Sequence, residues 1–395
     1  MDDPLSVSSH EKPSGGPETV HSRDRGTVRG LVGGVPSIGG YVAREPRGRA
    51  GRGTYRQVLG HRLSAEQPID QRRTICPMTD PRPFQFMLGV RGIVDRATLV
   101  EKARMAEATG YTHMCIHDHL TPQHAAIPVL TAVAMATERL RVVPLVLNND
   151  LRHPAVLAQE LATLDILSEG RLDIGIGAGW AETEYRGAGL QFDPPGVRIK
   201  RLIESLAILR GLFGDGPFNY TGRYYTITDM DGQPKPVQRP HPPFLVGGTR
   251  EHVVRVAARE GDIVGLDLRQ DRESLPDAFP DRTDVRIGWI RDEAGERFAR
   301  LDINVLRALG GLHVGPRPLE AAKAVSLAHG ERTGLDIDPE DVLESPYALI
   351  GTVPSLVDKI RRARERWGIN SYLLAWTDEP NLADLAPVIE QLSGT

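Results

Sequence analysis

The sequence predicts an α/β protein in which strands and helices form a closed (β/α)8 barrel with insertions. Short apolar runs alternate with amphipathic segments from residue 84 onward, and such alternation is typical of a parallel sheet covered on both faces. Eight strand-like runs fall within about 310 residues, which suits a barrel. No GxGxxG turn follows the first run, and this weakens the doubly wound alternative.

The first half of the barrel begins with a strand expected over residues 84–88. A helix follows over residues 95–110, where Leu99, Ala103 and Ala106 recur at helical spacing. Asp95 suits the N-cap of this helix and Gly110 its C-terminal stop. Further strands are expected over residues 111–116, 140–147 and 172–177, and further helices over residues 127–137, 154–167 and 197–213.

The second half opens with a small hairpin, expected over residues 218–228 around Thr221-Gly222. Strands follow over residues 243–246, 263–266, 301–308 and 371–375. The helices between them are expected over residues 250–260, 284–294, 318–328 and 353–367.

Composition narrows the function classes. Of 395 residues, 40% are hydrophobic and 25% are charged, which is enough to bury a large core. Two cysteines exclude a disulfide framework, no apolar run reaches about 18 residues, and no secretory signal opens the chain. A net charge of −4 gives no attraction for nucleic acid. We expect a soluble cytoplasmic protein that binds neither nucleic acid nor membranes.

The N-terminal 77 residues differ from the rest. They contain no Phe or Trp, and they carry 12 Lys and Arg against 8 Asp and Glu, whereas the other 318 residues carry 36 against 44. We therefore expect a disordered extension over residues 1–80, before a barrel domain over 81–395. A basic arm for nucleic acid is the functional alternative, but acidic residues interrupt it. Met78 is a candidate for the true start of the protein.

Strand two ends in His117-Asp118-His119, where a barrel places its chemistry. A His beside an Asp can be held in one tautomer for proton transfer near neutral pH. The pair could also simply close a turn. A metal site is a third interpretation, but it needs further ligands at later strand ends, and the spacing offers none. We therefore expect no metal.

Three later strand ends carry polar or small residues. Asn148 opens the Asn-Asn-Asp segment after strand three, where an amide can bond a heterocycle or cap a turn. Strand four ends in Gly177-Ala178-Gly179, and a later strand ends in Gly247-Gly248-Thr249 just before a helix. Small residues admit a flat ring, and a helix N-terminus binds anions. Together these segments favour a phosphorylated planar cofactor.

The block over residues 152–180, from Arg152-His153-Pro154 to Gly179-Trp180, closely resembles the bacterial luciferase-like oxidoreductases. Asp118-His119-Leu120 matches their second-strand motif. The segments over residues 220–225 and 244–264 are similar to their hairpin and late phosphate segment. The resemblance covers about residues 82–393, and it implies a TIM barrel that binds reduced FMN or the deazaflavin coenzyme F420.

The resemblance is greatest to the F420-dependent branch, and it implies roles for individual residues. Asp118 and His119 become the catalytic pair, with Asp118 also a cofactor contact. A non-proline cis peptide bond is expected between residues 144 and 147, beneath the ring. The other implied cofactor contacts are Asn148, Gly177, Ala178, Gly179, Tyr185, Gly247, Gly248 and Thr249.

Trp180 departs from the sugar-phosphate dehydrogenases of this family, which place a Glu there, so glucose 6-phosphate is not the expected substrate. We expect hydride transfer between F420 and a small organic substrate. The alternatives are an FMN-dependent monooxygenase, which uses dioxygen and needs a partner flavin reductase, and a flavin-binding protein without turnover. Relatives are often dimers, so a homodimer is the expected assembly.

Overall fold

The structure is a computed structural model that describes residues 53–54, 82–268, 275–306, 309, 312–377 and 382–395. The N-terminal extension expected over residues 1–80 lies outside the described residues, apart from Gly53–Thr54 (β1). This short strand pairs in parallel with Leu335–Asp336 (β13). Everything below concerns the unit that clusters over residues 50–395.

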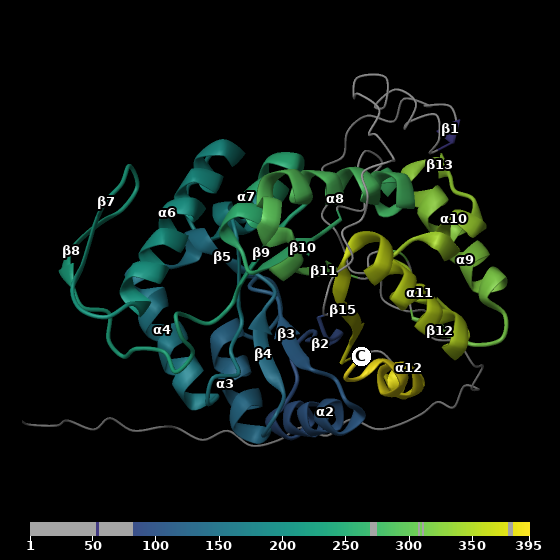
Figure 1. The fold of residues 1–395 in the computed structure, drawn as a ribbon, viewed down its shortest axis with the longest axis horizontal. Coiled ribbons are helices and arrows are strands. Elements are labelled where there is room, and N and C mark those ends of the chain that lie inside the picture. Colours follow the sequence, from purple (N-terminus) through teal and green to yellow (C-terminus); the bar gives the residue numbers. More distant parts are fainter. Residues whose placement is uncertain (1–52, 55–81, 269–274, 307–308, 310–311, 378–381) are drawn as a thin grey trace, which may run out of the picture. The chain divides into compact units, whose positions relative to one another are not determined.

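A parallel sheet of nine strands forms the centre of this unit (Figure 1), in the order β4-β3-β2-β15-β11-β10-β9-β6-β5. Its two end strands, β4 and β5, are successive pieces of one segment. β4 pairs with β3, β5 pairs with β6, and a bridge joins Val142 to Leu172. The segment that contains β4 and β5 therefore occupies one strand position and closes the sheet into an eight-stranded barrel. The strands are β2 (Gln85–Val90), β3 (His113–Ile116), β4 (Arg141–Pro144), β5 (Leu147–Asn148), β6 (Ile174–Gly177), β9 (Phe244–Gly248), β10 (Ile263–Leu266), β11 (Asp302–Leu306) and β15 (Ile369–Trp376). The predicted barrel is confirmed.

Helices surround the barrel and connect its strands. They are α2 (Arg96–Thr109), α3 (Ala126–Ala136), α4 (Pro154–Leu167), α5 (Glu182–Gly187), α6 (Pro195–Phe213), α7 (Glu251–Glu260), α8 (Pro280–Ala294), α9 (Pro318–Thr333), α10 (Pro339–Glu344), α11 (Val353–Trp367) and α12 (Ala386–Leu392).

Local sequence sets the ends of these helices. Asp95 caps α2, because its Oδ1 accepts the Thr98 N–H at 2.9 Å, and Gly110 ends the helix with φ +90°. Both ends of α2 were predicted.

Smaller strands lie outside the barrel. β7 (Phe218–Thr221) and β8 (Thr226–Met230) form the predicted antiparallel hairpin, and β12 (His313–Val314) pairs in parallel with β14 (Ile350–Gly351). The sequence did not predict β12 and β14, since two-residue strands have no detectable period.

The core has two layers because successive strand residues face opposite sides. On β2, Phe86, Leu88 and Val90 pack outward against the helices, whereas Met87 points into the barrel. The interior cluster comprises Met87, Cys115, Val143, Leu145, Leu245, Ile263, Leu373 and Trp376. Trp376 is the bulkiest residue of this interior cluster. Its indole packs against Gly89, where a Cβ would overlap the ring.

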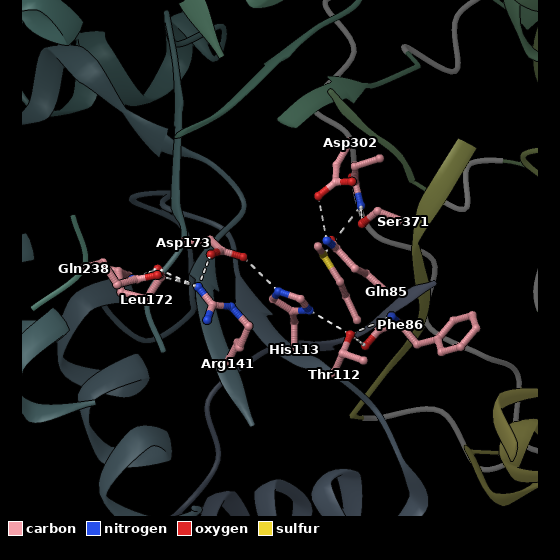
Figure 2. A network of polar contacts seen from close by, with 12 residues as sticks. Gln85, Phe86, Thr112, His113, Arg141, Leu172, Asp173, Gln238, Asp302 and Ser371 are labelled. Atoms are coloured by element: carbon pink, nitrogen blue, oxygen red, sulfur yellow. Dashed lines mark hydrogen bonds and ion pairs between the residues drawn. The ribbon is translucent and has the colours of Figure 1, made fainter. Parts of the chain in front are cut away.

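A buried polar network lies at the amino-terminal ends of the barrel strands (Figure 2). His113 Nε2 lies 2.8 Å from Oδ2 of Asp173, and Arg141 pairs with the other oxygen of that carboxylate. Burial raises the pKa of Asp173, but the hydrogen bond and charge of His113, with Arg141, outweigh it and lower the pKa below its usual value. The network ties β3, β4 and the segment before β6 together.

Candidate active site

The predicted site residues lie at one end of the barrel, because all of its strands are parallel and the residues lie at or after their carboxyl ends. They come from β3, β5, β6 and β9. The structure brings Asp118 to Asn148, His119 to Trp180, and Gly177 close to Gly247. We refer to this end as the barrel mouth.

Asp118 is 7% exposed, and both of its oxygens are engaged. Oδ2 accepts the backbone N–H of Asn148 at 3.1 Å, and Arg152 donates to Oδ2 and Oδ1 at 2.7 and 3.2 Å. Such a bidentate pair is geometrically specific. Asp118 therefore joins the end of β3 to the segment after β5. Its direct contact with a cofactor stays a prediction.

His119 is held by a partner that the sequence analysis missed. Its Nδ1 lies 2.8 Å from Oε1 of Glu184, and Oε2 of the same carboxylate accepts the Leu120 N–H at 3.1 Å. A carboxylate accepts hydrogen bonds, so the Nδ1 of His119 carries a proton. Its Nε2 has no partner among the described residues and is the nitrogen available for proton exchange. The side chain is 23% exposed.

Asn148 rests on Tyr185. The Tyr185 hydroxyl lies 2.9 Å from Oδ1 of Asn148 and 3.0 Å from Oδ2 of Asp150, and the Asp150 N–H also donates to Oδ1 of Asn148. Burial, with the charge of Asp150, raises the pKa of Tyr185 to about 12. Tyr185 is only 1% exposed, so a buried hydroxyl holds the Asn148 amide in place. Nδ2 of Asn148 makes no hydrogen bond within the described part of the chain.

Gly177 of β6 and Gly247 of β9 leave room for Val146. A Cβ at Gly177 would lie 2.9 Å from Cγ2 of Val146, and one at Gly247 would lie 3.5 Å from its Cγ1. The non-proline cis peptide expected between residues 144 and 147 is confirmed at Leu145–Val146. The guanidinium of Arg198 on α6 donates hydrogen bonds to the carbonyls of Ala178 and Gly179. This role of Arg198 was not predicted.

Gly247, Gly248 and Thr249 are half-buried and lead directly into α7. Arg250, the N-cap residue of α7, makes no side-chain hydrogen bond to the helix, so no side chain among the described residues caps it. Uncapped N–H groups at a helix N-terminus attract anions. The buried Arg286 donates to the Gly248 carbonyl at 3.2 Å. This turn can hold a phosphate.

A separate hollow of about 410 Å³ lies along α11, away from the mouth. Lys359 lines it, but its amine donates to the carbonyls of Leu343 and Ala348 at 2.7 Å each. Since that amine is occupied by structural bonds, we place the chemistry at the barrel mouth.

Within the described ranges, no group of three or more His, Cys, Asp or Glu could hold a metal ion. No described helix has the length and apolar character needed to span a bilayer.

Comparison with solved structures identifies the class of fold. The F420-dependent tetrahydromethanopterin reductase of Methanopyrus kandleri superposes with a TM-score of 0.61 at 19% identity, covering 78% of this chain and 97% of that one. This similarity, with the parallel strand order, shows that the fold is a (β/α)8 barrel.

Comparison of sequences identifies the family. The profile of the luciferase-like monooxygenases matches residues 83–282, half of the chain. This chain belongs to the luciferase-like monooxygenase family. The predicted resemblance is confirmed.

Two curated relatives show the range of cofactors. An FMNH2-dependent dimethylsulfone monooxygenase of Pseudomonas putida is 30% identical over 166 residues, 40% of this chain and 46% of that protein. An F420-dependent glucose-6-phosphate dehydrogenase of Amycolatopsis mediterranei is 35% identical over 172 residues, 42% and 51% respectively. The chain spans about half the length of these relatives.

Proposed function

We propose that this protein is an F420-dependent oxidoreductase that transfers a hydride between C5 of the deazaflavin and a small organic substrate. The observation that carries the proposal is the His119–Glu184 pair, 2.8 Å apart, which leaves Nε2 of His119 free at the mouth. Hydride transfer to a carbonyl needs a proton donor at the oxygen, and hydride transfer from an alcohol needs a proton acceptor there; an oriented imidazole is suited to both tasks.

The donor set at the mouth fits a phosphorylated planar cofactor. The uncapped N-terminus of α7, with Gly247 and Gly248 before it, would hold the phosphate. The small residues Gly177 and Ala178 would lie along the ring and its side chain, and Nδ2 of Asn148 is a donor for a ring carbonyl or nitrogen. Thr249 adds a hydroxyl beside the phosphate turn. When bound, the deazaflavin supplies or accepts the hydride.

The residues of the chain supply orientation and the proton. Glu184 fixes the tautomer of His119 through Nδ1 and leaves Nε2 available for the reacting oxygen. In the reducing direction, His119 acts as the imidazolium, with a proton on each ring nitrogen, and Nε2 donates its proton to the carbonyl oxygen as the carbon is reduced. In the oxidising direction it accepts the hydroxyl proton. Asp118 acts through Asn148 and Arg152 and is a positioning residue.

The curated relatives include proteins that depend on each of the two cofactors. F420-dependent dehydrogenases match this chain at 32–35% identity, and the FMNH2-dependent dimethylsulfone monooxygenases at 30%. Titration of the purified protein with each cofactor separately tests the proposal, because the two share a phosphate but differ in their ring. Tight binding of FMN with weak binding of F420 would assign the chain to the oxygen-using monooxygenases, which depend on a partner flavin reductase.

A further inference from the structure

Five side chains form a continuous row across the barrel mouth. The guanidinium carbon of Arg91 lies 4.4 Å from the ring centre of Trp376, and the rings of Trp376 and His117 are 4.9 Å apart. The His117 and His119 rings are 5.8 Å apart. The rings of His119 and Trp180 are 5.5 Å apart with their planes at 83°. This row, which we call the mouth row, runs from the ends of β2 and β15 over β3 to the segment after β6.

One end of the mouth row is packed and the other is open. Trp376 is 8% exposed and belongs to the interior cluster of the barrel, whereas Trp180 is 70% exposed. His117 between them donates from Nδ1 to the Leu145 carbonyl at 2.6 Å. Trp180 is therefore the member of the row with most of its surface left for a ligand, and it lies next to the imidazole assigned to proton transfer.

The charges around the open end are already engaged. Glu184 binds His119 and the Leu120 N–H, and Asp118 binds Arg152. Burial lowers the pKa of His117 to about 4, with smaller effects from His119 and Arg91, so its ring is neutral near pH 7. The uncharged indole of Trp180 is thus an apolar neighbour of the His119 ring at the open end.

We propose that Trp180 determines substrate specificity, and that the substrate is a flat aromatic or unsaturated ring compound carrying the alcohol or carbonyl group that His119 serves. This inference rests on the proposed function. Edge-on and offset ring contacts add to the gain from burying apolar area, so an exposed indole favours a flat ring. A sugar phosphate has no flat ring, so it gains nothing from such ring contacts.

The test uses the F420-loaded full chain labelled with nitrogen-15 at its tryptophans. The chain has four, and Trp180→Phe assigns the indole N–H signal of Trp180. We expect 2-naphthylmethanol to shift the Trp180 signal saturably, while Trp289 and Trp367 on the outer helices stay in place. The saturated analogue, decahydro-2-naphthylmethanol, carries the same alcohol without the flat ring. Glucose 6-phosphate is the polar probe, and we expect neither of these two to shift the Trp180 signal.

Variants at Trp180 test whether this residue contacts the substrate or the cofactor. Trp180→Ala is expected to weaken naphthylmethanol binding about 10-fold, while Trp180→Phe keeps it within about 3-fold because a flat ring remains. Met135→Ala on α3 is the control, since Met135 is 66% exposed and lies outside the mouth row. The affinity for F420 should stay within about 3-fold of wild type in all three variants.

Each outcome decides the inference. A shift by the flat probe alone, lost in Trp180→Ala, supports it. Equal binding of the flat and saturated alcohols, or no shift while F420 binds, overturns it and leaves the proposed function standing. A parallel loss of F420 affinity in Trp180→Ala overturns it by moving Trp180 into the cofactor site. Failure of both F420 and FMN to bind overturns the proposed function, and this inference with it.

Discussion

Gly179 and Tyr185 fit together only because position 179 carries no side chain. A Cβ at Gly179 would overlap the Tyr185 hydroxyl and lie 2.5 Å from Oδ1 of Asn148. The φ angle of Gly179 is +74°, in the left-handed region that favours glycine. The glycine turn after β6 and the amide proposed to bind the cofactor ring are therefore one structural unit.

We expect Gly179→Ala to weaken cofactor binding by at least about 10-fold, because Asn148 must move to admit the methyl group. The matched control is Gly189→Ala. Gly189 has a similar φ of +70°, but a Cβ there would meet nothing within 4 Å. Both variants share the backbone strain of about 1 kcal/mol. Cofactor titration and thermal unfolding compare them, and equal cofactor affinities would contradict the account.

Glu184→Gln should lower turnover about 10- to 100-fold with little change in cofactor affinity, because His119 loses the carboxylate that fixes its tautomer. His119→Ala sets the lower limit of activity, and it should retain cofactor binding. The control is Glu182→Gln on the same helix, whose exposed carboxylate pairs with Arg186 at the surface.

Nitrogen-15 spectra of the His119 ring give a readout independent of activity. They should show a proton on Nδ1 in the wild type and a mixture of tautomers in Glu184→Gln. An unchanged tautomer with unchanged turnover would remove Glu184 from the proposed mechanism, and full turnover in His119→Ala would remove His119.

Asp173→Asn should destabilise the fold by about 3 kcal/mol near pH 7, since it removes the charge that pairs with buried His113 and Arg141. The folded-state pKa of Asp173 is lowered, so its stabilisation is complete above the unfolded pKa of about 4 and is lost as the pH falls through the folded value. The difference between variant and wild type should therefore narrow below about pH 4.

Urea unfolding across this pH range measures the effect. Asp358→Asn is the control, because the Asp358–Arg362 pair is exposed on α11, and such pairs contribute little. A difference that stays constant with pH would contradict a depressed pKa at Asp173.

The barrel could be predicted because its signals are local. Asp95 and Gly110 mark the ends of α2 as capping residues, and the apolar runs of β3, β6 and β10 lie within one or two residues of the predicted strands. The prediction treated residues 140–147 as one strand, and the structure divides it at Pro144, before the Leu145–Val146 peptide.

The site could be predicted only in part because its bonds are not local. The strand-end rule brought His119, Asn148 and the glycine turns to one place. Glu184 was missed because α5 has six residues and no helical period in sequence, and Arg152 and Arg198 reach their partners across 34 and about 20 positions. Arginines are common on helices and loops, so nothing in the sequence marked the partners of these two.

The most direct test of the proposed function is difference spectroscopy of the purified full chain titrated with F420 and, separately, with FMN. We predict saturable binding of F420 at least about 10-fold tighter than that of FMN, a difference of about 1.4 kcal/mol. Gly179→Ala should weaken this binding at least about 10-fold, and Gly189→Ala should keep it. Tighter binding of FMN, or equal binding in the two glycine variants, would contradict the account.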